Sequence, residues 1–295
     1  MAKAREIIKR RKAVRNIRKI TKVMQMVATA RFQKSLRRAK ATRPYVERLT
    51  DLVHTVAASI GHSPGAVRHP LLATRPIRRV GILVVTSNRG LAGGFNSSIL
   101  RMVMARVREL EEAGTQVDIH VGGRKGGAYF RFARRTVRQA YVNVGDNPIM
   151  DEMLPIAQNL MDDFTSGQID AIKIAYMKFL SVGQQRPVLQ DVLPINFASA
   201  ADTGGKRVVR PDIEFSPDAP ILLADLLPTM VRSAAFQAFI DSAVSEQIAR
   251  MLAMAAATEN AESMSRLLTR DYNRARQSQI TSELAELMGG VEAMK

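Results

Sequence analysis

The glycines and prolines of this chain are unevenly distributed, and their distribution limits the folds open to it. Sixteen of the 18 glycines lie between Gly61 and Gly205, and the other two are Gly289 and Gly290. Residues 1–60 contain no glycine and one proline, and residues 229–288 contain neither. Glycine costs about 1 kcal/mol relative to alanine inside a helix. The pattern therefore predicts two long helices on either side of a middle segment that turns often.

The first of these segments has the spacing of a coiled coil. Its apolar residues recur at intervals built from three and four, as a helical seam requires. Pro44 removes one backbone donor, but the pattern resumes directly after it, so we expect a bend there and not an end. The expected seam consists of Val14, Ile17, Met24, Val27, Val46, Leu49, Val53, Val56 and Ile60.

The C-terminal segment has a similar pattern. We expect its helix to begin after residues 216–220, where Ser216 is a suitable N-cap, and to end at Gly289. Its expected seam consists of Val244, Ile248, Met251, Leu252, Ala255, Leu267, Leu268, Tyr272, Leu284 and Leu287. Helices of ~55 and ~65 residues would be roughly 80–100 Å long. The middle segment is too small to cover that length, so we expect the two helices to pair antiparallel, with their base on a globular domain.

The middle segment alternates strand and helix patterns. Residues 80–88 form a continuous apolar, β-branched run, typical of a strand buried on both faces of a parallel sheet. The expected strands are residues 80–88, 117–121, 139–144, 169–179 and 188–195, and the expected helices are 96–113 and 148–164. The last two strands are expected to be antiparallel across the turn at Gly183. The predicted fold class is an open, Rossmann-like α/β domain bracketed by a long antiparallel α-helical coiled coil.

The charge of the chain is concentrated at its start. Seventeen of the first fifty residues are Lys or Arg and two are acidic, so this segment carries 17 − 2 = +15 of the net +17. Such a localised charge predicts an acidic partner. A nucleic-acid-binding coiled coil is one alternative, but only Phe32 and Tyr45 could stack on bases and no binding module is recognisable. A helix lying on a lipid surface is another, although tryptophan is absent and the apolar stripe is narrow.

Signals for catalysis are weak. The chain has no cysteine, which excludes disulfides and thiolate chemistry. The four histidines lack metal-ligand spacing, and the acidic pairs at 151–152 and 162–163 are interpreted as solvated charge. No uninterrupted apolar run approaches the ~18 residues of a membrane span. We therefore predict no enzyme activity, no metal, no cofactor and no membrane insertion for this chain.

Two glycine-rich loops invite a phosphate-binding interpretation. Residues 87–96 (SNRGLAGGFN) follow the first expected strand, and residues 122–127 (GGRKGG) follow the second. The first departs from the dinucleotide pattern G-x-G-x-x-G, and neither has the Gly-Lys-Ser/Thr ending of a nucleotide P-loop. Both loops are interpreted as tight turns at strand ends.

Several motifs together resemble one known family. They are KITKVMQMVATARFQKS (19–35), RPYVE (43–47), TSNRGLAGGFN (86–96), GDNP (145–148), SEQIARMLAMAAATENA (245–261) and YNRARQSQITSELAELMGGVEAM (272–294). In this order, and over nearly the whole chain, they resemble the γ subunits of rotary, F-type ATP synthases. At Ala255 the family usually has a lysine, so any role of that lysine is unsupported here.

The resemblance implies a division of the chain and a set of partners. Residues 1–60 and 206–288 would form the shaft, 70–205 the foot and 289–295 a tail. One copy of the shaft would turn inside a hexamer of α and β subunits, and the foot would rest on the membrane c-ring beside the ε subunit. The chain would couple proton flow to ATP synthesis and regulate ATPase activity and proton flow, while ATP chemistry belongs to β. Its place would be the cytoplasmic side of a bacterial inner membrane, as a peripheral protein that binds no nucleic acid.

The resemblance also implies partner-binding residues. Basic residues of the first helix would lie near an acidic lever segment of β, beside a methionine at the same contact. An Arg-Gln pair of the second helix would contact the catch loops of β. Ordinary helix surface is the alternative for each. These positions are Lys19, Lys22, Met24, Arg31, Arg276 and Gln277.

Overall fold

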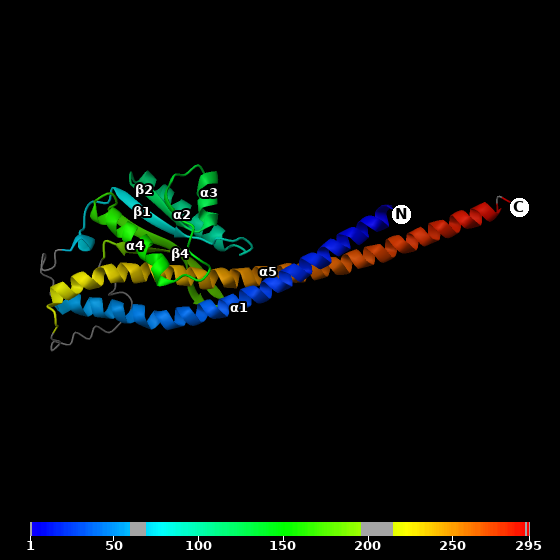
Figure 1. Cartoon of the computed structure of the whole chain (residues 1–295). Helices are drawn as coiled ribbons and strands as arrows, with labels where there is room; N and C mark the ends of the chain where they lie inside the picture. Colours follow the sequence, from blue (N-terminus) through cyan, green and yellow to red (C-terminus); the bar gives the residue numbers. More distant parts are fainter. Residues whose placement is uncertain (1, 60–68, 196–214, 293, 295) are drawn as a thin grey trace. The chain divides into compact units, whose positions relative to one another are not determined.

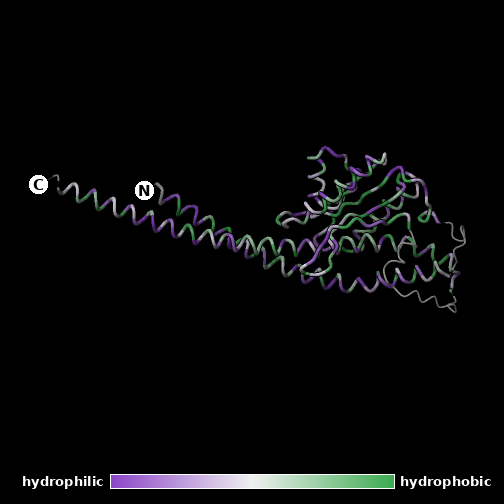
Figure 2. The backbone as a smooth tube through the Cα atoms, turned by 180° about the vertical axis from the view of Figure 1, so that it is seen from behind, coloured by the Kyte–Doolittle hydropathy of each residue, from purple (hydrophilic) through white to green (hydrophobic). Residues whose placement is uncertain are grey.

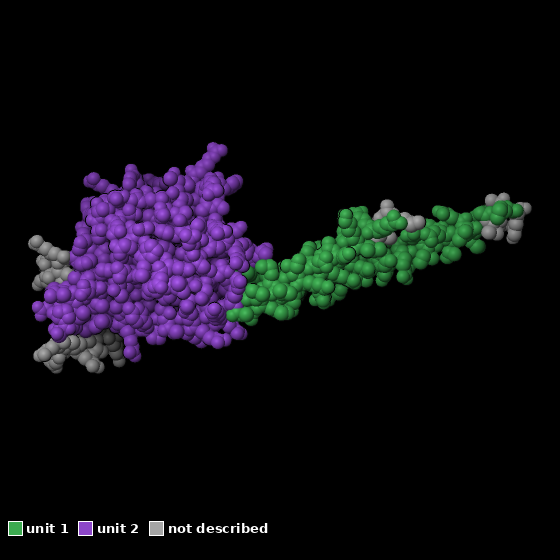
Figure 3. All heavy atoms as spheres, viewed as in Figure 1, with its two compact units in different colours: residues 1–30, 250–295 green, residues 31–249 purple. Residues whose placement is uncertain are grey.

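The computed structural model describes residues 2–59, 69–195, 215–292 and 294. The chain divides into two compact units (Figure 3). Unit 1 consists of residues 1–30 and 250–295, and unit 2 consists of residues 31–249. Helix α1 (Ala2–Ser59) and helix α5 (Ala219–Glu292) each contribute to both units, and each is unbroken over its length. The two long helices that the glycine distribution predicts are thereby confirmed.

Unit 1 is an antiparallel pair formed by the start of α1 and the end of α5 (Figure 1). Three contacts fix its register. The Thr258 hydroxyl donates to the Thr21 hydroxyl at 2.9 Å. Arg18 and Glu262 are 3.7 Å apart. The guanidinium of Arg11 lies 5.0 Å from the centre of the Tyr272 ring.

The seam of unit 1 differs from the expected one. Val14, Thr21 and Ala28 are buried on α1, seven residues apart, as are Met254 and Ala261 on α5. Small side chains let two helices approach closely, and the Thr21 hydroxyl is satisfied by Thr258. The expected seam residues Ile17, Val27, Leu252, Leu267, Leu284 and Leu287 are instead exposed. Apolarity alone assigned Ile17, Val27, Leu252 and Leu267 wrongly, because several seam positions are taken by small or polar residues such as Thr21, Ala28 and Ala261.

Unit 2 is built on a five-stranded sheet of order β3-β2-β1-β4-β5. The strands are β1 (Arg79–Val85), β2 (Gln116–Gly122), β3 (Val137–Tyr141), β4 (Ala171–Ser181) and β5 (Gln184–Leu193). The first four are parallel, and β5 is antiparallel to β4. The helices between them are the short η1 (Pro70–Leu72), α2 (Phe95–Glu112), α3 (Arg124–Phe132) and α4 (Met150–Thr165). The expected open α/β domain with an antiparallel last pair is confirmed.

Helices cover both faces of the sheet. The core on one face joins Leu83 and Val85 of β1 to residues of α1, α4 and α5. The core on the other face joins Ile82 and Val84 to residues of α2 and α3. Because successive side chains of a strand point to opposite faces, β1 is buried on both, which explains its continuous apolar run.

The loop at residues 122–127 was expected to be a turn, but helix α3 begins within it, at Arg124. Gly123 has a φ of 102°, which favours glycine. Gly126 lies inside the helix, where an added Cβ would be 2.8 Å from side-chain atoms of Thr86 and Val121. Its N–H donates to the Thr86 hydroxyl at 3.0 Å. These glycines therefore allow a helix to pack closely on the sheet.

The ends of α5 also differ from expectation. The helix begins at Ala219, where the Asp218 carbonyl accepts from the N–H of Leu222, and Ser216 lies outside it. It continues through Gly289 and Gly290 to Glu292, because neither glycine adopts the positive φ of a helix C-cap. Helix α1 continues through Pro44, as expected. The expected boundary at residue 206 and the expected seam residue Ile60 fall outside the described residues.

Among the described residues, α5 is the one helix with an 18-residue window apolar enough to cross a membrane, at a mean hydropathy of 1.3. A window of this kind can contain up to two charged residues, so it need not be an uninterrupted apolar run. One such helix is weak evidence, since a core helix of a soluble protein has the same composition. Leu223, Leu227 and Val231 of α5 are buried in the core of unit 2.

Candidate functional site

The first candidate surface lies on α1 within unit 1. Because the seam is made of Val14, Thr21 and Ala28, the larger apolar residues of this stretch point outward. Figure 2 shows hydrophilic and hydrophobic positions alternating along both helices of unit 1. The exposed apolar side chains are Ile17, Ile20, Val23, Met26 and Val27, each between 46% and 60% exposed. Exposed apolar side chains next to basic ones on one stretch of helix indicate a protein partner.

Three of the expected site residues belong to this surface. Lys19 and Lys22 are exposed, and Met24 is half-buried. The ammonium group of Lys22 lies 3.5 Å from the Gln25 side-chain oxygen. All three residues lie on the same mixed basic and apolar stretch of α1.

Arg276 and Gln277 lie on α5, farther along unit 1. Both are exposed. The pairing of Arg11 with Tyr272 places Ala2 opposite residues near 281. The last turns of α5 therefore have no described residue of α1 beside them, which explains why Leu284, Leu287 and Met288 are 58%, 68% and 73% exposed.

Arg31 belongs to unit 2, where it forms an ion pair with an acidic residue of the same chain. Its guanidinium donates to the Asp146 carboxylate at 2.6 Å, and that carboxylate is also 3.7 Å from Arg89. The Arg31 side chain is 41% exposed and the Asp146 side chain 22% exposed. Of the six expected site residues, Arg31 is the one with an ion pair in its own unit. Sequence reasoning missed this pairing, although Asp146 stands in the quoted GDNP motif.

The GDNP loop fastens several segments of unit 2. Arg38 of α1 donates to the Pro148 carbonyl at 3.0 Å. The amide of Asn88, in the loop after β1, donates to the Val144 carbonyl at 2.6 Å. The Glu152 side chain accepts from the N–H of Ile149 and caps α4. The motif is therefore a junction between α1, the loop after β1 and the start of α4.

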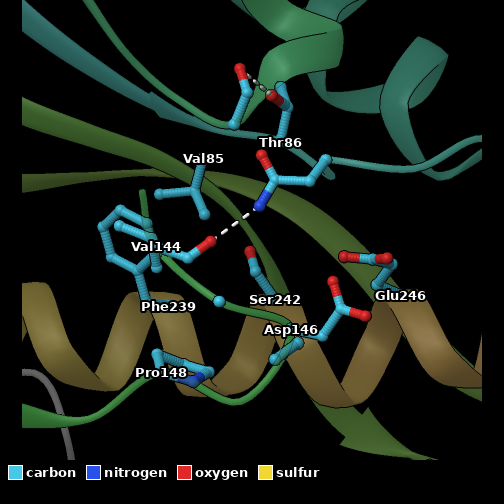
Figure 4. Close-up of a pocket in the computed structure, with 12 residues that line it drawn as sticks. Val85, Thr86, Val144, Asp146, Pro148, Phe239, Ser242 and Glu246 are labelled. Carbon is cyan, nitrogen blue, oxygen red and sulfur yellow. Dashed lines mark hydrogen bonds between the residues drawn. The ribbon is translucent and has the colours of Figure 1, made fainter. Parts of the chain in front are cut away.

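The carboxyl ends of the parallel strands are where doubly wound sheets usually bind ligands. Here α5 occupies that crevice (Figure 4). A Cβ added to Gly122 would lie 2.7 Å from Cζ of Phe239, so the glycine makes room for this ring. Phe239, Ser242 and Glu246 of α5 line the small cleft that remains between the strand ends and the GDNP loop. Side chains of α5 thus occupy most of the space at the strand ends where a ligand would bind in other doubly wound sheets.

A partly buried charge network lies farther back along β2, on the same face of the strand as Gly122. Arg138 donates to Asp118 at 3.0 Å and to Asp163 at 2.7 Å, so Asp163 is not the solvated charge that the sequence indicated. His120 is 1% exposed, with Nε2 3.8 Å from Asp163. Burial lowers the pKa of His120, and the Asp163 charge opposes that shift. Among the described residues, no group of three or more His, Asp or Glu could hold a metal ion.

The fold and its surfaces define a class of protein. One unit is an antiparallel coiled coil with exposed basic and apolar side chains, and the other is an α/β domain whose ligand crevice is filled by its own helix. The family model described as ATP synthase matches residues 3–294. The ATP synthase gamma chain of Rhodopirellula baltica is 40% identical over 300 residues, and that of Leptospira biflexa is 39% identical over 296, each covering 100% of both chains. The chain belongs to the ATP synthase gamma-chain family.

Solved structures show the same fold. A chain of the Euglena gracilis mitochondrial ATP synthase, in an assembly described as OSCP/F1/c-ring, matches with a TM-score of 0.67 and 18% identity. The match covers 99% of this chain and 95% of that one. A chain of the rotor of the same enzyme matches with a TM-score of 0.62 and 16% identity over 95% of this chain and 99% of that one.

Proposed function

We propose that this chain is the non-catalytic central rotor subunit of a proton-translocating F-type ATP synthase. It couples proton flow through a membrane c-ring to ATP synthesis at β subunits by rotating inside the α/β hexamer, and it regulates ATPase activity and proton flow. The family membership over the whole chain supports this assignment. The observation that carries it is the coiled coil of unit 1, whose small-residue seam leaves Ile17, Ile20 and Val23 exposed beside Lys19 and Lys22.

The proposed partners are the α and β subunits, an ε subunit and the c-ring, with one copy of this chain per complex. Residues 1–60 and 206–288 are the proposed shaft, 70–205 the foot and 289–295 the tail. Lys19, Lys22, Met24 and Arg31 are proposed to face the acidic lever of β, and Arg276 and Gln277 its catch loops. The exposed side chains of Lys19, Lys22, Arg276 and Gln277 are consistent with such contacts. Arg31 would contact β while Asp146 holds it, through the part of its side chain that remains exposed.

The chain is a peripheral part of a membrane-bound complex. We place it on the cytoplasmic side of a bacterial inner membrane, where its relatives from Rhodopirellula and Leptospira support a bacterial setting.

Co-purification tests the proposal. We expect the chain to assemble with the α and β subunits of the same organism in a ratio of one to three to three, giving a complex that hydrolyses ATP. The chain alone should have no ATPase activity. ATPase activity of the purified chain, or its failure to co-purify with α and β, would refute the proposal.

A further inference from the structure

Strand β4 extends past its neighbour β1. The pairing of these two strands ends where Val84 lies opposite Ala175, whereas β4 continues to Ser181. Strand β5 accompanies β4 on the other side over this whole stretch. Backbone groups of β4 that point toward β1 beyond Ala175 therefore need other partners, because buried N–H and C=O groups are rarely left unpaired.

The register identifies which groups these are. In an antiparallel pair, residues alternate between bonding to the neighbouring strand and pointing away from it. Met177 lies opposite Pro187, which has no N–H to donate, so the backbone groups of Met177 face away from β5. Phe179, two residues later, faces the same way.

Helix α5 supplies the missing partners. The N–H of Met177 donates to the Ser242 hydroxyl at 3.2 Å, and the Ser245 hydroxyl donates to the Met177 carbonyl at 3.3 Å. The Asp241 carboxylate accepts from the Gln237 amide at 2.8 Å, and the backbone of Phe179 opposes the rise in its pKa that burial causes. Asp241, Ser242 and Ser245 are 3%, 3% and 1% exposed, and Ser242 faces the sheet from the helix in Figure 4.

We propose that Ser242 and Ser245 form a polar key that fixes α5 to the sheet against load. They act as positioning residues, and the inference rests on the proposed rotor function. Apolar contacts between helix and sheet are non-directional and set no single register. Hydrogen bonds to the backbone of Met177 do set a register, because its N–H and carbonyl cannot move without the strand. Since α5 continues unbroken from the key into unit 1, part of any force that α5 carries between the coiled coil and the sheet passes through this contact.

The same helix offers a matched control. Ser233 is 2% exposed, and its hydroxyl has no hydrogen-bond partner among the described residues. Ser233→Ala therefore removes a buried hydroxyl from α5 without removing a contact to β4. Ser242→Ala removes the acceptor of the Met177 N–H, and Ser245→Ala removes the donor to its carbonyl.

Amide hydrogen exchange of the full chain tests the local contact. Met177 should exchange at least tenfold faster in Ser242→Ala than in the unaltered chain, whereas Ser233→Ala should leave its exchange rate unchanged. Equal rates in Ser242→Ala and Ser233→Ala would overturn the proposed key, whatever the result for coupling.

Proton uptake by the complete complex in vesicles tests the role under load. For the double variant Ser242→Ala with Ser245→Ala, ATP hydrolysis without a gradient should stay within twofold of the unaltered complex. Proton uptake per ATP against an opposing gradient should fall at least twofold, with Ser233→Ala unchanged. Uptake per ATP equal to that of Ser233→Ala would overturn the proposal and leave the rotor function intact. Absence of coupling in the unaltered complex would overturn both. Should the double variant fail to assemble, Ser245→Ala alone gives the same comparison.

Discussion

Arg31 of helix α1 donates to the carboxylate of Asp146, 115 residues later in the chain, at 2.6 Å. The contact joins two motifs that the sequence presents separately, and it fastens α1 to the loop that precedes α4 in unit 2. Arg89 stands 3.7 Å from the same carboxylate, so Asp146 balances two cations.

This pair should contribute measurably to stability. In a double-mutant cycle with Arg31→Ala and Asp146→Ala, we expect a coupling energy of roughly 0.5–1 kcal/mol, the upper part of the range for partly exposed ion pairs. Urea unfolding of the full chain gives the free energies. The pair Arg10 and Glu6, whose side chains are 69% and 61% exposed, is the control and should give less. A coupling energy for Arg31 and Asp146 no larger than that of the control would contradict the role of this junction.

Asp241 should make stability depend on pH. Burial raises its pKa to about 6, although the Gln237 hydrogen bond and the charges of Arg43 and Lys178 oppose the shift. The pKa in the folded chain lies above the ordinary 3.8. The contribution of Asp241 to the free energy of unfolding is therefore complete below pH 3.8 and is lost as pH rises through 6. Asp241→Asn should therefore raise the free energy of unfolding at pH 8, by at most about 3 kcal/mol, and by about half as much at pH 5. Asp225→Asn, at an exposed position of the same helix, should show no such pH dependence; a gain that is the same at both pH values would refute this assignment.

Lys19 and Lys22 should matter in the complex and not in the free chain. Both are exposed, so replacing both by glutamine should leave the unfolding of the isolated chain unchanged. In the assembled complex, loss of two positive charges opposite an acidic segment should lower ATP-driven proton uptake per ATP, most clearly at low salt. Lys40→Gln, at an exposed position in unit 2, is the control. Uptake equal to that of the control would remove these lysines from the proposed contact.

Arg276→Ala should lower turnover or assembly of the complex without altering the fold. The side chain is exposed and contributes little to the stability of unit 1, so any loss reports on a partner. Steady-state ATP hydrolysis and circular dichroism measure the two effects. Arg270→Ala, also exposed on α5, should behave like the unaltered chain. Normal turnover and proton pumping in Arg276→Ala would count against the contact with the catch loops.

The sequence predicted the architecture because long-range composition decides it. The absence of glycine from two segments and the apolar run of β1 identified both helices and the parallel sheet. The details of packing depend on which residues of different helices and strands come into contact, and the sequence does not show this directly. Thr21 and Ala28 form the seam because small residues permit close approach, and no apolar pattern marks them. Likewise, Ser242 accepts from the backbone N–H of Met177, which β1 does not bond because β4 extends beyond the end of β1.

The candidate surfaces show the same division. The charge of the first fifty residues pointed to Lys19 and Lys22, which are exposed as a partner contact requires. It also pointed to Arg31, whose nearest acidic residue is Asp146, and a count of charges cannot pair residues so far apart in the chain. The glycine-rich loop at residues 122–127 was interpreted as a turn. Only the structure shows that Gly122 leaves room for the ring of Phe239.

Rotation of this chain inside the α/β hexamer is the most direct test of the central claim. The chain has no cysteine, so Glu112→Cys, at the exposed end of α2, provides a single attachment point for a bead. With the hexamer fixed to a surface, we predict stepwise rotation of the bead in one direction on addition of ATP. ATP hydrolysis by the same complexes without rotation of the bead would contradict the account.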